Sequence, residues 1–130
     1  MSEKDHISLT PAEWNLMEYL WERLSITGRE AAKHCAEQIG WSRTTTLTVL
    51  RRLVEKGAVS CDESGARNRY APLIEREDAA LQETDDFLRR VYKGSVGMML
   101  SAMTKKQELS KEEIDELREI LRQAESRGLK

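Results

Sequence analysis

The sequence predicts a mainly α-helical fold that carries one small β-hairpin. Three capping boxes, at residues 10–13, 27–30 and 110–113, mark the starts of helices. A short turn at residues 40–42 separates the second predicted helix from the third, which ends at Gly57. Two strand-like stretches around a Ser-Gly turn come next. Together these signals predict a helix-turn-helix followed by a wing, with a helical tail behind it.

The three helices before the wing each carry an apolar face that would form the core of the head. In the first helix the residues at core spacing are Trp14, Met17, Leu20, Trp21 and Leu24. The second helix, which runs to about residue 39, offers Ala31, Ala32, Cys35, Ala36 and Ile39. The third, capped by Ser42, offers Thr46, Val49, Leu50 and Leu53, with Val54 beside them.

The tail is predicted to contain three helices. The first, residues 73–92, has Leu73, Ala80, Leu81, Phe87, Leu88 and Val91 as its expected packing residues. Gly94 and Ser95 break it, and a short apolar helix follows at residues 96–103. A final helix runs from the last capping box to about residue 128. We therefore predict a winged helix-turn-helix domain at residues 1–72 and a helical dimerisation domain at residues 73–130.

The tail carries more apolar surface than so thin a segment could bury on itself. We expect this surface to form a homodimer, which would place two heads side by side. The residues expected at the interface are Leu88, Val91, Tyr92, Met98, Met99, Leu100, Met103, Ile114, Leu117 and Leu121. The alternative is a tail that folds back onto the head.

Composition favours a soluble, cytoplasmic protein. Of the 130 residues, 39% are hydrophobic and 34% are charged. No apolar run approaches the roughly 18 residues that cross a bilayer, so we expect no membrane insertion. The first residues lack the basic-then-apolar layout of a signal peptide. Two cysteines are too few for a disulfide framework.

The net-basic segment of the sequence lies in the middle of the chain. The net charge is −2, yet residues 41–70 carry six basic and three acidic side chains, while the segments on both sides are net acidic. A basic segment on an acidic protein can form an electrostatic footprint for phosphate. This distribution is compatible with nucleic-acid binding in spite of the negative total.

The third predicted helix has an exposed face that could enter the major groove of double-stranded DNA. The candidate DNA-binding residues there are Arg43, Thr44, Thr45, Leu47, Thr48 and Arg51. We expect the leucine to touch a thymine methyl and the threonines near the helix start to bond phosphate. On the returning strand of the wing, Arg67 and Arg69 flank Asn68 and could reach the DNA backbone. The alternatives are an ordinary solvated helix face and a charged edge strand.

Other kinds of site find little support. His6, His34, Cys35 and Cys61 lack the paired short spacings of a structural zinc site, so we predict no metal. No catalytic or cofactor-binding motif is present, so we predict neither an enzyme nor a bound cofactor. Two rival functions stay open: a winged-helix module that binds a protein, and a metal- or redox-responsive regulator that uses Cys35 and Cys61.

The chain resembles the BlaI/MecI/CopY family, the penicillinase-repressor type of bacterial regulators. The segments that carry the resemblance are LTPAEW (9–14), WSRTTT (41–46), RLVEKGA (52–58), YAPL (70–73) and LSKEEIDEL (109–117). Their order and spacing together are specific, and they extend over essentially the whole sequence.

The resemblance implies a homodimeric repressor that binds a dyad operator, often one that controls β-lactam resistance genes. In members that respond to β-lactams, a membrane sensor protease triggers cleavage of an Asn-Phe bond in the tail. The matching position here is Ser101-Ala102, which departs from that pattern. The copper-responsive branch has a cysteine-rich C-terminus, but no cysteine follows Cys61 in this chain.

Overall fold

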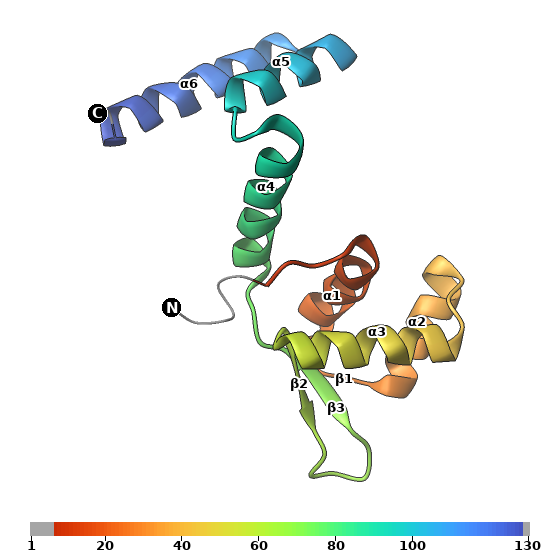
Figure 1. Ribbon diagram of the computed structural model, residues 1–130. Helices are drawn as coiled ribbons and strands as arrows, with labels where there is room; N and C mark the ends of the chain where they lie inside the picture. Colours follow the sequence, from red (N-terminus) through yellow and green to blue (C-terminus); the bar gives the residue numbers. More distant parts are fainter. Residues whose placement is uncertain (1–6, 129–130) are drawn as a thin grey trace. The chain divides into compact units, whose positions relative to one another are not determined.

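Three helices and a three-stranded antiparallel sheet form the first of two units in the chain. The computed structural model describes residues 7–128, and the units divide between Phe87 and Leu88. In chain order the first unit contains α1 (Pro11–Arg23), β1 (Ile26–Thr27), α2 (Gly28–Ile39), α3 (Arg43–Lys56), β2 (Val59–Asp62), β3 (Arg69–Pro72) and most of α4 (Arg76–Tyr92). The β2–β3 hairpin extends away from α1, α2 and α3 as a wing (Figure 1).

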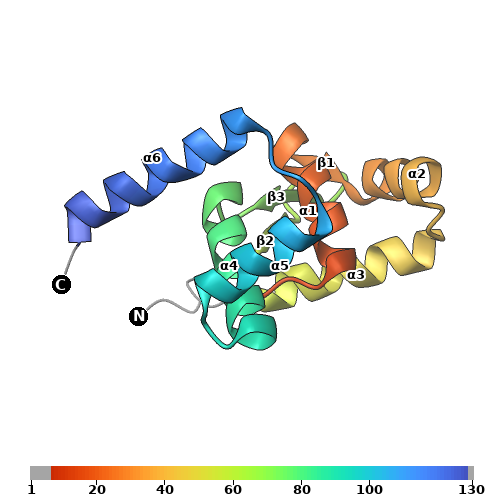
Figure 2. The ribbon, with the colours of Figure 1, turned by 90° about the horizontal axis from the view of Figure 1, so that it is seen from above.

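The helix-turn-helix expected from the sequence is confirmed. Helices α2 and α3 pack against each other and are joined by a tight turn (Figure 2). Gly40 ends α2 with a φ of 71°, a left-handed conformation that glycine adopts without strain. Gly57 ends α3 in the same way, with a φ of 85°. Both helices of the motif therefore end at residues that have no Cβ.

The sheet has the order β1-β3-β2, so the returning strand of the wing is central. Tyr70 on β3 lies opposite Cys61 on one side and Ile26 on the other. Strand β1 was not expected, because two residues are too short to show an alternating pattern. Thr27 ends this strand and also caps α2, since its hydroxyl accepts a hydrogen bond from the Glu30 N–H at 3.1 Å. The wing and the helix-turn-helix thus share one residue.

The core lies between α1, α2, α3 and the sheet. Its largest fully buried side chains are Leu16, Met17, Leu20, Ile26, Leu50 and Leu53. The face expected for α3 is confirmed, because Thr46, Val49, Leu50 and Leu53 are all buried. Three expected core residues of the other helices are exposed instead. They are Leu24, which ends α1 with a φ of 68°, and Ala36 and Ile39, which lie where α2 runs past the core.

Helix α4 begins three residues later than expected, because the chain before it is fixed against α1. The Trp21 indole N–H donates to the Ile74 carbonyl at 2.9 Å. Arg76 then donates two hydrogen bonds to the Glu18 carboxylate, at 2.8 and 2.9 Å. These contacts keep the first turns of α4 with the first unit, which extends to Phe87.

Helix α4 buries little of its apolar surface within the described chain. Ala79 is its buried residue, whereas Leu73, Leu81, Phe87 and Val91 are exposed. A small side chain allows the start of α4 to approach the first unit closely, and the larger apolar side chains then lie on other faces.

The second unit contains the end of α4, α5 (Val96–Lys106) and α6 (Lys111–Gly128). Lys93 and Gly94 both have positive φ, 52° and 86°, and they end α4. Ser95 and Ser110 cap the two helices that follow. No residue of α5 or α6 is buried within the described chain. Exposed apolar side chains in this unit are Val91, Val96, Met98, Met103, Ile114, Ile120 and Leu121.

A buried ion pair joins the start of α1 to the end of α3. The Glu13 side chain is 1% exposed, and Lys56 Nζ lies 2.6 Å from its Oε1. The same oxygen accepts the Thr10 N–H at 2.8 Å, and Lys56 also donates to the Ser8 carbonyl at 2.8 Å. Burial raises the pKa of Glu13, but the hydrogen bonds from Lys56 and Thr10 outweigh burial and leave the pKa below its ordinary value of 4.5.

We predict that Glu13→Gln destabilises the fold by about 1–3 kcal/mol. The loss is smaller than that expected for breaking a fully buried ion pair, because Lys56 is partly exposed. Glu13 has a lowered pKa in the folded state, so its stabilisation is complete above pH 4.5 and is lost as pH falls through that lowered pKa. Urea unfolding at pH 7 and at lower pH measures the difference. The gap between variant and parent should close in acid, and a gap independent of pH would contradict this role.

The control is Glu18→Gln, which removes the half-exposed partner of Arg76. We expect a loss of under about 1 kcal/mol, the usual range for exposed ion pairs.

Candidate nucleic-acid interface

Two of the three consecutive threonines at the start of α3 have structural roles. Thr46 is buried, and its hydroxyl donates to the Ser42 carbonyl at 3.2 Å. Thr45 is exposed, donates its N–H to Ser42 Oγ at 3.1 Å and accepts from the Ser42 hydroxyl at 3.0 Å. These bonds explain why residues of low helix propensity begin this helix. Thr44 stays on the exposed face.

A groove lies between α3 and the wing. Its α3 side presents hydroxyls and a guanidinium, and its wing side presents a thiol, a carboxylate and an amide. The lining residues of this α3–wing groove are Thr44, Leu47, Thr48, Arg51, Val54, Cys61, Glu63, Asn68 and Tyr70. Burial raises the pKa of Tyr70, and the neighbouring Cys61 raises it further. The phenol is therefore a neutral donor at physiological pH.

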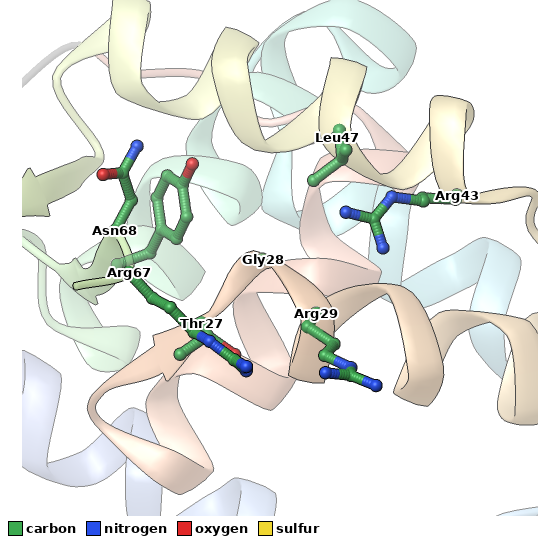
Figure 3. A pocket seen from close by; sticks show the side chains of 8 residues that line it. Thr27, Gly28, Arg29, Arg43, Leu47, Arg67 and Asn68 are labelled. Atoms are coloured by element: carbon green, nitrogen blue, oxygen red, sulfur yellow. The ribbon is translucent and has the colours of Figure 1, made fainter. Parts of the chain in front are cut away.

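A second hollow adjoins the groove and shares Leu47, Asn68 and Tyr70 with it. We call it the Gly28 hollow; its other lining residues are Thr27, Gly28, Arg29, Arg43 and Arg67 (Figure 3). The glycine makes the close packing here possible, because a Cβ on it would lie 3.2 Å from Leu47 Cδ2. Three arginines from α2, α3 and the wing line this hollow, and no acidic residue does.

The structure brings together most of the predicted site residues. Thr44, Leu47, Thr48 and Arg51 line the α3–wing groove, while Arg43, Leu47 and Arg67 line the Gly28 hollow. Thr45 lines neither. The leucine is half-buried and packs against the core, so it is the floor of both hollows and not a freely exposed side chain.

Arg69 lies apart from the other predicted arginines. Its Nε donates to Ser25 Oγ at 2.9 Å and its Nη2 donates to the Ser25 carbonyl at 3.2 Å. It thereby fastens β3 to the segment that precedes β1.

Sequence reasoning missed Arg29. The second capping box placed it in the first turn of a helix, but nothing local in the sequence indicated that this turn lies beside the wing. The predicted helix-turn-helix could have indicated it, because folding of that motif brings the first turn of α2 close to the first turns of α3.

The cysteines and histidines are dispersed. Burial raises the pKa of the Cys35 thiol, which is in the core, whereas Cys61 lies in the α3–wing groove. His34 stacks on the Tyr19 ring with centroids 3.8 Å apart. Within residues 7–128 no three such side chains or carboxylates are grouped as metal ligands. His6 lies outside the described residues.

Comparison with known proteins agrees with this arrangement. Residues 9–123 match the penicillinase repressor family. The chain belongs to that family. The resemblance expected from the sequence segments is therefore confirmed, as is the winged-helix fold of the head.

Members of the penicillinase repressor family resemble the chain over nearly its whole length. The penicillinase repressor of Bacillus licheniformis is 33% identical over 119 residues, which cover 92% of this chain and 93% of that protein. The methicillin resistance regulatory protein MecI of Staphylococcus aureus strain N315 is 29% identical over 113 residues, 87% of this chain and 92% of that protein.

A solved structure of one family member matches the head. It is the solution structure of monomeric Bacillus licheniformis BlaI in complex with the blaP half-operator, with a TM-score of 0.51 and 32% identity. The match covers 56% of this chain and 89% of that one. Within residues 7–128 no helix has the length and hydropathy needed to cross a membrane.

The two wing arginines should differ in what they do. We expect Arg69→Ala to lower the free energy of unfolding by about 1 kcal/mol, because it loses its bonds to Ser25. Arg67→Ala should leave stability unchanged within about 0.5 kcal/mol, as is usual for exposed positions. Urea unfolding of both variants measures this. Equal losses would show that the Ser25 contacts do not stabilise the wing.

Proposed function

We propose that the chain is a sequence-specific transcriptional repressor that binds a dyad operator as a homodimer. In this proposal α3 enters the major groove and the wing contacts the adjacent backbone. The complex of BlaI with a half-operator supports it, because that family member shares the fold of the head. The names of the relatives support resistance genes as targets. Such a protein acts on DNA in the cytoplasm and needs neither a cofactor nor catalysis.

The observation that carries the proposal is the α3–wing groove with the Gly28 hollow beside it. Thr44, Thr48 and Arg51 share one side of the groove, at spacings that place them on one helix face. A guanidinium there can bond a guanine edge with two hydrogen bonds, and a hydroxyl can bond any base. We therefore assign base contacts to this face.

We assign contacts to the DNA backbone to the side chains around the α3–wing groove. Arg43 and Arg67 line the Gly28 hollow, and Thr45 is exposed at the start of α3. Arg69 is assigned a weaker contact, since its guanidinium already bonds Ser25. Leu47 can contact a thymine methyl only if that base enters the α3–wing groove or the Gly28 hollow, because the leucine packs against the core.

The second part of the proposal is dimerisation through residues 73–130. The proposed interface residues are exposed or half-exposed in the described chain: Leu88, Val91, Tyr92, Met98, Met99, Leu100, Met103, Ile114, Leu117 and Leu121. Large apolar side chains on so many turns of thin helices favour a partner, because association removes their surface from water. Residues 1–72 would then supply the DNA contacts of each protomer.

If a sensor protease releases this chain from DNA, the cleaved bond would have to differ from the Asn-Phe bond of β-lactam-responsive members, because Ser101-Ala102 stands at that position. Ser101 and Ala102 lie in the middle of α5, so the bond between them is helical. A protease reaches such a bond only when the helix opens locally. We propose that, if a membrane sensor protease is a partner, it acts indirectly and after such opening.

Operator binding tests the function directly. Purified protein is titrated against its own upstream DNA and a scrambled duplex at several salt concentrations. We expect at least about 10³-fold preference for its own upstream DNA, with affinity falling steeply as salt rises. No preference and a shallow salt slope would instead indicate a winged helix that binds a protein. Dependence on added metal or on oxidation would favour the regulator that uses Cys35 and Cys61.

Arg51→Ala should relax specificity by about 1–3 kcal/mol, because it removes a base contact. The measurement compares operator, single-base variants of it and random DNA. The matched control is Arg122→Ala in α6, where the guanidinium pairs with Glu119 at 2.6 Å. Equal weakening by Arg51→Ala on all duplexes would contradict the assignment to bases.

Met98→Glu combined with Leu121→Glu should produce a monomer, since two charges would be buried in an apolar interface. Sedimentation equilibrium measures the mass, and helicity by circular dichroism shows that the tail still folds. We expect half-site binding to persist while full-operator affinity falls. A variant that remains dimeric would place the interface elsewhere.

A further inference from the structure

We propose that the Gly28 hollow is a seat for one backbone phosphodiester of the operator, held jointly by Arg29, Arg43 and Arg67. This inference rests on the proposed function and deepens it, since it adds a residue of α2 to the DNA-contacting set. It also divides the surface into a part that positions the DNA and a part that reads its sequence.

The three guanidiniums come from three different elements and line one hollow. Arg29 is in the first turn of α2, Arg43 is the first residue of α3, and Arg67 lies in the connection between β2 and β3 (Figure 3). All three side chains belong to exposed residues. Guanidinium groups that line one hollow repel one another, so an anion bound among them removes an unfavourable interaction and adds charge-assisted hydrogen bonds.

No carboxylate of the described chain neutralises this cluster. None of the eight lining residues is acidic, and the ion pairs and hydrogen bonds found within residues 7–128 use other arginines. Arg69 and Arg76, by contrast, are committed to Ser25 and Glu18. The cluster is therefore one place in the head where positive charge is left for a ligand.

The position of the hollow indicates a DNA phosphate. It shares Leu47, Asn68 and Tyr70 with the α3–wing groove, so a strand whose bases face Thr48 and Arg51 would pass its backbone alongside. Its volume of about 530 Å³ leaves room for the sugars on either side of the seated phosphate. Contacts to phosphate fix register and orientation but carry no sequence information.

Methylphosphonate scanning of the operator tests the seat. Each phosphate near the half-site is replaced in turn by a neutral methylphosphonate, and affinity is measured for the full-length protein and for Arg29→Ala, Arg43→Ala and Arg67→Ala. For the parent protein we expect one position to weaken binding by about 10-fold or more. In every arginine variant, replacement at that same position should cost less than about 3-fold, because the shared interaction is already lost.

Lys33→Ala is the matched control, since it removes an exposed cation from α2 that does not line the hollow. Its scan should be identical to that of the parent. Arg29→Ala should weaken operator and random DNA by the same factor and leave the thermal midpoint of the protein unchanged.

The proposal is overturned if the three variants suppress three different phosphates, or if Arg29→Ala binds both duplexes as the parent does. Either result leaves the operator preference of the parent protein intact, so it would refute the shared seat without refuting the repressor. Loss of operator preference in the parent would instead refute the proposed function.

Discussion

The ion pair between Glu13 and Lys56 connects the start of α1 with the end of α3. Glu13 also completes the cap of α1, and Lys56 also bonds the Ser8 carbonyl, so one buried contact joins three segments. Its partners are 43 residues apart in the chain. Together with the core between the two helices, this contact holds α3 against α1 and so helps to fix the position of the exposed face of α3.

Two sets of cations in the head differ in their surroundings. Lys56, Arg69 and Arg76 are bonded to oxygen atoms of the protein and stabilise the fold. Arg29, Arg43 and Arg67 line a hollow without an acidic residue. A charge that serves folding is already compensated, whereas a charge kept without a partner raises the local potential. This separation explains how a chain with a net charge of −2 can present a positive surface to DNA.

Local signals in the sequence predicted the helices well because capping residues and glycines act over three or four positions. Thr10, Thr27 and Ser110 cap helices in the structure as expected. What depends on tertiary contact was not predictable: the two-residue strand β1, the burial of Ala79 and the place of Arg29 beside the wing. Leu24 shows the same limit, since its spacing fits the apolar stripe but its backbone has already left the helix. In the candidate site, the exposed face of α3 followed from helical periodicity. That Arg69 bonds Ser25 while Arg67 lines the Gly28 hollow could be seen only from the register of β1 and β3.

Thr27 connects the wing to the helix-turn-helix. The same residue pairs with Arg69 in the sheet and caps α2, so a rotation of the hairpin would pull on the first turn of that helix. A wing joined only through its own turn could adapt to DNA independently, as a hinged flap does. In the proposed complex, a duplex whose groove width does not suit the wing would also disturb the position of α3, and such a duplex would be bound less well even when its bases are correct. Under the proposed function, the shape of the operator would be recognised together with its sequence.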